Sequence, residues 1–115
     1  MSAQSIGILS LTATAGSGGV TVNRFVGYDG SVASTDEATI GVATTTAASG
    51  VLYTLVTIGT TIVEAGAAIT AGDVLKVDSS GRGITWVTSG AKVGRALQAA
   101  TAAGQLIEVR LLDNV

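Results

Sequence analysis

The sequence contains no cysteine, no histidine and no proline. Without cysteine and histidine, the chain cannot form a disulfide, a zinc site built from these residues, or a Ser-His-Asp or Cys-His nucleophilic pair. Histidine is also the side chain that normally titrates near neutral pH. General acid–base catalysis would therefore need an unusually shifted carboxylate or lysine. We expect a protein that is not an enzyme and that uses no metal and no cofactor.

Aromatic and charged residues are also scarce. Aromatic residues make up 3% of the chain and charged residues 12%, against about 25% charged residues in an average protein. The 18 alanines bring little buried area to the core. A thin core and a surface of low charge together indicate that a partner, including further copies of the chain, covers part of the surface.

Targeting and nucleic-acid signals are weak. The first basic residue is Arg24, so the basic start of a secretory signal peptide is missing. Residues 38–63 carry no charge, but threonine, glycine and serine interrupt the apolar residues. A membrane-spanning helix needs about 20 predominantly apolar residues, so we expect no membrane segment. A net charge of −2 without a basic cluster argues against nucleic acid as the direct partner.

Alternation of apolar and polar residues predicts β-strands. Ile107, Val109 and Leu111 would lie on one face of a strand, with Glu108 and Arg110 on the other. Turn signals recur at short intervals between such segments. The predicted strands are Ile6–Thr14, Val20–Tyr28, Ile40–Thr46, Val51–Ile58, Thr61–Glu64, Asp73–Val77, Ile84–Val87, Lys92–Gln98 and Gln105–Leu112.

This spacing predicts an all-β fold, a small single-domain β-barrel or sandwich of short antiparallel strands. At most one short helix is expected, either after the capping-box pattern Ser34–Glu37 or within the alanine-rich segment Ala96–Ala103. The uncharged residues 1–15 are interpreted as a possible extended N-terminal arm that orders on a partner. Residues 16–115 would then form the β-barrel or sandwich domain.

Several motifs have ordinary structural explanations. The glycine-rich segment Gly16–Gly19 precedes a strand rather than a helix, so a turn is favoured over a phosphate-binding loop. Asp73 and the Asp78–Gly81 segment lack the ligand spacing of a calcium loop, and Asp78–Gly81 is typical of a hairpin turn. Trp86 is expected to anchor the core or a subunit interface rather than to stack on a sugar.

The C-terminal half carries a pattern that resembles a known family. It consists of AITAGDVLKV at residues 68–77, a turn and a short strand, AKVGRAL at residues 91–97, and QLIEVRL at residues 105–111. These segments resemble the small head-decoration, or capsid cement, proteins of tailed bacteriophages, and the resemblance covers roughly residues 38–115. In this pattern Gly72, Gly94 and Gly104 make turns or close approaches, and Asp73 closes a turn.

The resemblance implies a virion structural protein that is made in the bacterial host cytoplasm and binds the outer surface of the assembled capsid. The implied partners are the major capsid protein and further copies of the chain, as a homotrimer. The arm would pair its backbone with a capsid strand. The residues expected to make this contact are Ser5, Ile6, Gly7, Ile8, Leu9, Ser10, Leu11 and Thr12.

Two other functions stay open from the residues alone. Trp86 on a β-rich scaffold is compatible with a carbohydrate-binding or adhesin module of a fibre or cell surface. The same composition is compatible with another virion part, such as a tail-tube or head–tail connector subunit.

Overall fold

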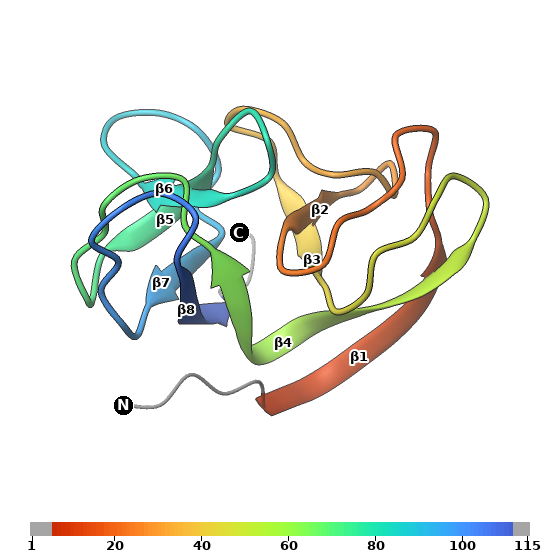
Figure 1. The fold of residues 1–115 in the computed structure, drawn as a ribbon, viewed down its shortest axis with the longest axis horizontal. Coiled ribbons are helices and arrows are strands. Elements are labelled where there is room, and N and C mark those ends of the chain that lie inside the picture. The colour runs from red at the N-terminus through yellow and green to blue at the C-terminus, as the bar shows by residue number, and fades with distance from the viewer. Residues whose placement is uncertain (1–5, 112–115) are drawn as a thin grey trace.

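A computed structural model describes residues 6–111 and shows an eight-stranded antiparallel sheet (Figure 1). The strands are β1 (Ile6–Thr14), β2 (Phe25–Gly27), β3 (Thr39–Ala43), β4 (Leu52–Glu64), β5 (Val74–Val77), β6 (Gly83–Thr85), β7 (Gly94–Ala96) and β8 (Leu106–Leu111). These residues contain no helix, and hence none that is long and apolar enough to cross a membrane. The predicted all-β fold is confirmed.

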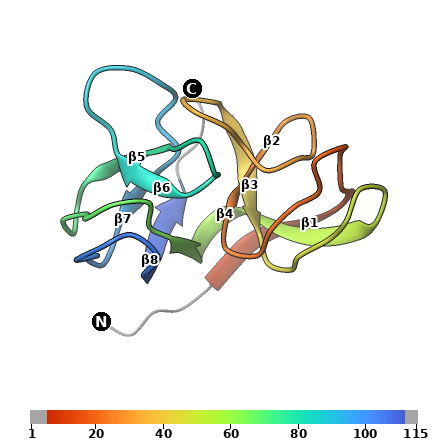
Figure 2. The same ribbon diagram turned by 45° about the horizontal axis from the view of Figure 1, so that its top comes forward.

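The sheet curls on itself into a nearly closed barrel. Its strand order is β2-β3-β4-β8-β7-β5-β6, with β1 paired to β4 outside this path. The two ends of the path meet where the backbone N–H of Phe25, on β2, donates to the carbonyl of Gly81, just before β6, at 2.8 Å. Figures 1 and 2 show β5–β8 gathered on one side, β1–β3 on the other, and β4 running between them.

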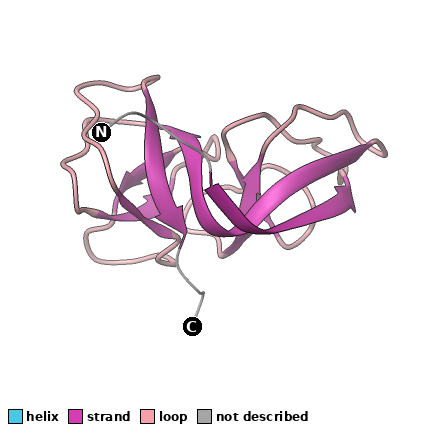
Figure 3. Cartoon of the chain, turned by 90° about the horizontal axis from the view of Figure 1, so that it is seen from below, coloured by secondary structure: helices cyan, strands magenta, loops and turns pink. Residues whose placement is uncertain are grey.

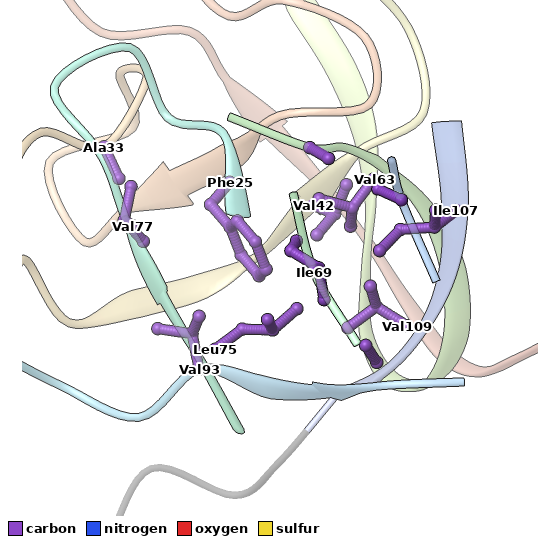
Figure 4. Close-up of a cluster of buried hydrophobic side chains, with 13 residues drawn as sticks. Phe25, Ala33, Val42, Val63, Ile69, Leu75, Val77, Val93, Ile107 and Val109 are labelled. Carbon is purple, nitrogen blue, oxygen red and sulfur yellow. The ribbon is translucent and has the colours of Figure 1, made fainter. Parts of the chain in front are cut away.

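Two hydrophobic clusters fill the interior. The larger one joins β2, β3, the end of β4, β5, β7 and β8 around Phe25, Val63, Leu75 and Val109 (Figure 4). The smaller one lies on the other side and includes Tyr53 and Leu55 from β4; its remaining buried members are Ala15, Val20, Val26, Ala43 and Ala47. Because β2, β3 and β4 each contribute to both clusters, these three strands connect the two halves.

An ionic network links β2 to the hairpin of β5 and β6. A nitrogen of Arg24 lies 3.3 Å from the Glu64 carboxylate, which in turn lies 3.8 Å from Arg82. Arg82 also pairs with Asp78 at 3.1 Å. All four side chains are partly exposed, so each pair contributes at most about 1 kcal/mol of stability. The network therefore fixes the relative position of the elements more than it stabilises them.

The predicted strands differ most from the structure in two places. Only Phe25–Gly27 of the predicted strand Val20–Tyr28 is a strand, because the chain turns at Asn23, whose φ of 65° is left-handed. The predicted strands Val51–Ile58 and Thr61–Glu64 are one continuous strand, β4. Gly59 does not end a strand but lies at an irregularity within it.

The turn predicted at Asp78–Gly81 and the turn that Asp73 closes are confirmed. Asp29 and Gly30 reverse the chain after β2, and the Asp29 carboxylate accepts a hydrogen bond from the Ser31 N–H at 3.0 Å. Asp78 accepts hydrogen bonds from the N–H groups of Ser80 and Arg82 in the hairpin between β5 and β6. Asp73 closes its turn through the Thr70 N–H at 3.0 Å.

Candidate interaction surface

The most exposed apolar surface follows β1. We call the paired segments Ile6–Thr14 and Leu52–Thr60 the β1–β4 ribbon; it runs along the lower edge of Figure 1 and the near face of Figure 3. Along β1 every residue is exposed except Ala13, which is half-buried. The exposed apolar side chains of the ribbon are Ile6 (58%), Ile8 (77%), Leu9 (43%), Leu11 (38%), Leu52 (67%) and Ile58 (41%). A strand exposed on both faces gains little from burial in the monomer.

Two irregularities give the ribbon its local shape. Gly7 is paired with Gly59 and Leu9 with Ile58, so Ile8 has no register partner; the register then shifts back before Ser10. A β-bulge of this kind bends the strand and re-aims the side chain of the extra residue. Gly59 has a φ of +115°, and a Cβ atom there would lie 2.3 Å from the Ile6 carbonyl oxygen. This close backbone approach requires glycine.

The outer edge of β1 has no strand beside it within residues 6–111, because β1 pairs with β4 alone. Proteins usually protect such an edge with charged residues or proline. Neither occurs in the two segments of the ribbon. The free edge and the apolar side chains together are the features expected of a strand that pairs with another chain.

The structure brings most of the predicted contact residues together. Residues 6–12 all lie on β1 and all are exposed; Ser5 lies outside the described residues. The predicted arm, residues 1–15, is described from Ile6 onward, and there it is a strand of the main sheet. Sequence reasoning missed Leu52 and Ile58 of β4, which extend the apolar surface. Their position depends on a pairing between segments about 45 residues apart, which no local pattern shows.

Trp86 lies at the surface. It is half-buried and belongs to neither hydrophobic cluster. Its indole Nε1 donates to the Gly90 carbonyl at 2.9 Å, and the Lys92 ammonium lies 4.5 Å from the ring centroid. This position does not make Trp86 a core residue; its predicted role at a subunit interface stays a prediction.

Titratable groups form no compact reactive cluster in the described part of the chain. No group of three or more Asp, Glu, His or Cys side chains there is arranged to hold a metal ion. The one resolved shift concerns Tyr53: burial raises the pKa of its phenol, and the Asp29 carboxylate acts in the same direction. Tyr53 belongs to the smaller hydrophobic cluster, so this shift follows from packing.

Comparison with known proteins agrees with the geometry. The family model of phage cement proteins matches residues 4–111. The chain belongs to the phage cement protein family. A member of this family is a structural protein of the virion, associated with the capsid. No curated protein sequence matches the chain.

The phage cement fold of this chain is also found in a solved structure. The N base of head fibre protein gp8.5 of bacteriophage phi29 is 20% identical and superimposes with a TM-score of 0.74. The match covers 92% of this chain and 97% of that chain. At this identity the similarity establishes a shared fold, and the family match carries the assignment to phage structural proteins.

Proposed function

We propose that this phage cement protein binds the outer surface of the assembled capsid through the β1–β4 ribbon and stabilises the shell. The observation that carries the proposal is the free edge of β1, flanked by exposed apolar side chains on an uncharged ribbon. The contact would combine two contributions. A strand of the shell protein would pair with the backbone of β1, and the apolar side chains would be removed from water.

Binding of this kind stabilises the shell by linkage. A protein that binds the mature lattice and not its dissociated subunits shifts the equilibrium toward the lattice. No reactive side chain is needed, because the free energy comes from backbone hydrogen bonds and burial. We propose a homotrimer as the binding unit, since three simultaneous contacts convert modest individual affinities into high avidity.

A substitution at Ile8 tests the ribbon contact. Ile8 is 77% exposed and has no register partner on β4, so Ile8→Lys should leave the monomer folded. At a buried interface the lysine would have to be desolvated, and capsid binding should fall about 100-fold or more. Binding is measured by co-sedimentation with purified shells that lack the protein.

Tyr28→Lys is the matched control. Tyr28 is 67% exposed and lies outside the ribbon, next to the Asp29-Gly30 turn. Tyr28→Lys introduces the same charge as Ile8→Lys, and this variant should bind shells as tightly as the wild type. Equal binding by Ile8→Lys and the wild type would contradict the ribbon contact, whereas a wild type that does not bind shells would refute the proposed function itself.

A further inference from the structure

A row of side chains crosses the outer face of the sheet in register. Arg95 on β7 is paired with Arg110 on β8, and Arg110 is paired with Thr60 on β4. On one side the row continues from Arg95 to Val74 and then to Trp86, whose N–H donates to the Val74 carbonyl at 2.8 Å. On the other side Thr60 is paired with Ile6 of β1.

Direct cross-strand partners point to the same face of a sheet, so these six side chains form one line, which we call the basic row. Its members are Trp86, Val74, Arg95, Arg110, Thr60 and Ile6. All of them are exposed or half-buried, whereas the adjacent residues Leu75, Ala96 and Val109 point into the larger hydrophobic cluster. Lys92 adds a third cation, stacked over the Trp86 ring.

The cations of this face have no acidic partner among residues 6–111. The ion pairs formed within residues 6–111 use Arg24, Lys76 and Arg82, and none includes Lys92, Arg95 or Arg110. Arg95 donates to the Gly72 carbonyl at 2.8 Å. Like charges placed directly opposite each other on neighbouring strands destabilise a sheet. The protein therefore keeps an unfavourable Arg95–Arg110 pair at its surface.

One acidic residue, Glu108, lies on the same strand as Arg110. Glu108 lies two residues before Arg110 on β8, and its side chain therefore points to the same face. It is 4% exposed, and its Oε1 has no hydrogen-bond partner within the described residues. The Glu108 carboxylate is therefore not displayed at the surface. The exposed charge of the face remains positive.

We propose that the basic row is a second contact surface of this protein, on which a carboxylate-bearing segment of the capsid shell docks. Arginine is suited to this role because its planar guanidinium binds a carboxylate through two parallel hydrogen bonds. Arginine and tryptophan are also the residues that most often dominate the binding energy of protein interfaces. An acidic segment would relieve the repulsion between the arginines and cover Trp86 and Val74.

The shell fits this surface better than a second copy of the chain. Among the acids of residues 6–111, Asp29 alone is in the exposed class. The others are half-buried or buried and are held in ion pairs or turns of their own, apart from Glu108. One exposed carboxylate does not match three cations. The row also ends at Ile6, the first described residue of the ribbon, so a partner bound to the ribbon can extend across it. The inference therefore rests on the proposed function.

The test compares the double variant Arg95→Gln/Arg110→Gln with the wild type in co-sedimentation with purified shells. Binding should weaken about 10- to 100-fold. Raising NaCl from about 0.05 to 0.5 M should weaken the wild type more than the variant, because salt screens the ion pairs that the variant lacks. Arg95→Lys/Arg110→Lys should retain the salt dependence but bind less tightly than the wild type, because lysine cannot form the two parallel hydrogen bonds.

Ser17→Glu/Ser49→Glu is the charge control. It lowers the net charge by the same two units at exposed turn positions away from the row, and it should bind shells like the wild type. Far-UV circular dichroism and thermal unfolding confirm that each variant is folded. Equal affinity and equal salt dependence of the wild type and Arg95→Gln/Arg110→Gln would overturn the inference while leaving the proposed function intact.

Two other results would also overturn it. If Arg95→Gln/Arg110→Gln lost self-association but bound shells normally, the occupant of the row would be a second copy of the chain. If the wild type did not bind shells at all, the proposed function would fail, and this contact with it.

Discussion

A single phenol shows how packing sets the chemistry of a residue in this protein. Tyr53 is 3% exposed, and burial raises its pKa above the ordinary value near 10. The folded state therefore holds the phenol proton more tightly than the unfolded state does. By linkage, this group lowers the free energy of unfolding as the pH rises above about 10, when the unfolded chain ionises first.

We predict that Tyr53→Phe loses less stability than the wild type between about pH 9 and pH 11. Urea unfolding at each pH measures the free energy, and the slope against pH is compared between the proteins. Tyr28→Phe removes a phenol that is 67% exposed and serves as the control. A slope for Tyr53→Phe as steep as that of the wild type would show that the Tyr53 phenol does not contribute to alkaline unfolding.

At the scale of elements, the ribbon depends on one glycine. An alanine Cβ at Gly59 would lie 2.3 Å from the Ile6 carbonyl oxygen and 2.8 Å from the Ile8 nitrogen, in a residue whose φ is +115°. We predict that Gly59→Ala destabilises the fold by roughly 2–4 kcal/mol, because strain at a positive φ adds to a backbone clash.

Gly50→Ala separates these two effects. Gly50 also has a positive φ, +83°, but nothing lies within 4 Å of an added Cβ atom. This variant should lose only about 1 kcal/mol. Thermal or urea unfolding measures the loss of stability of both variants. Equal losses would show that the backbone around Gly59 accommodates the added Cβ atom without a further loss of stability.

The same two elements show what a single sequence can predict. The bounds of β1 agree with the prediction because its Ile, Leu and Thr residues give a strong local strand signal despite Gly7. Gly59 misled the prediction of β4, since a glycine inside a strand marks a bulge as readily as an end. The segment 20–24 has strand-like alternation, but Asn23 turns the chain and places Arg24 against Glu64, a contact set by the fold.

At the scale of the whole molecule, the surfaces proposed for binding depend on non-local pairing. Residues 6–12 carry no charge and no proline, and together with the family resemblance this predicts that they contact the capsid. The sequence does not show that β1 lies at an edge, or that Arg95 and Arg110 are neighbours. Both facts follow from the strand order, in which β8 lies between β4 and β7. The sequence alone is therefore enough to propose residues 6–12 as a contact segment, whereas the basic row required the structure.

The self-association of the protein depends on the surface that each protomer exposes. The accessible surface of 5443 Å² is close to the roughly 5,700 Å² expected for a compact monomer of this mass, so the protomer does not lack a core. The area of the surface is ordinary, but its composition is unusual: the ribbon exposes apolar side chains and carries no charged residue. We propose that the shell covers the edge of β1 and the side chains near Ile8, and that a neighbouring subunit covers Leu52, which lies at the other end of the ribbon beside Thr14.

We predict a homotrimer, which sediments at micromolar concentration as a species of about three times 11.3 kDa. Leu52, 67% exposed on the β4 side of the ribbon, is the position to test, and Leu52→Lys should shift the distribution toward the monomer because it places a charge in the contact. Thr101→Lys, in an exposed loop, should not. If the wild type sedimented as a monomer and single copies were spaced separately on the shell in electron micrographs, three-fold avidity could not contribute to binding, and the ribbon and the basic row would have to hold each protomer alone.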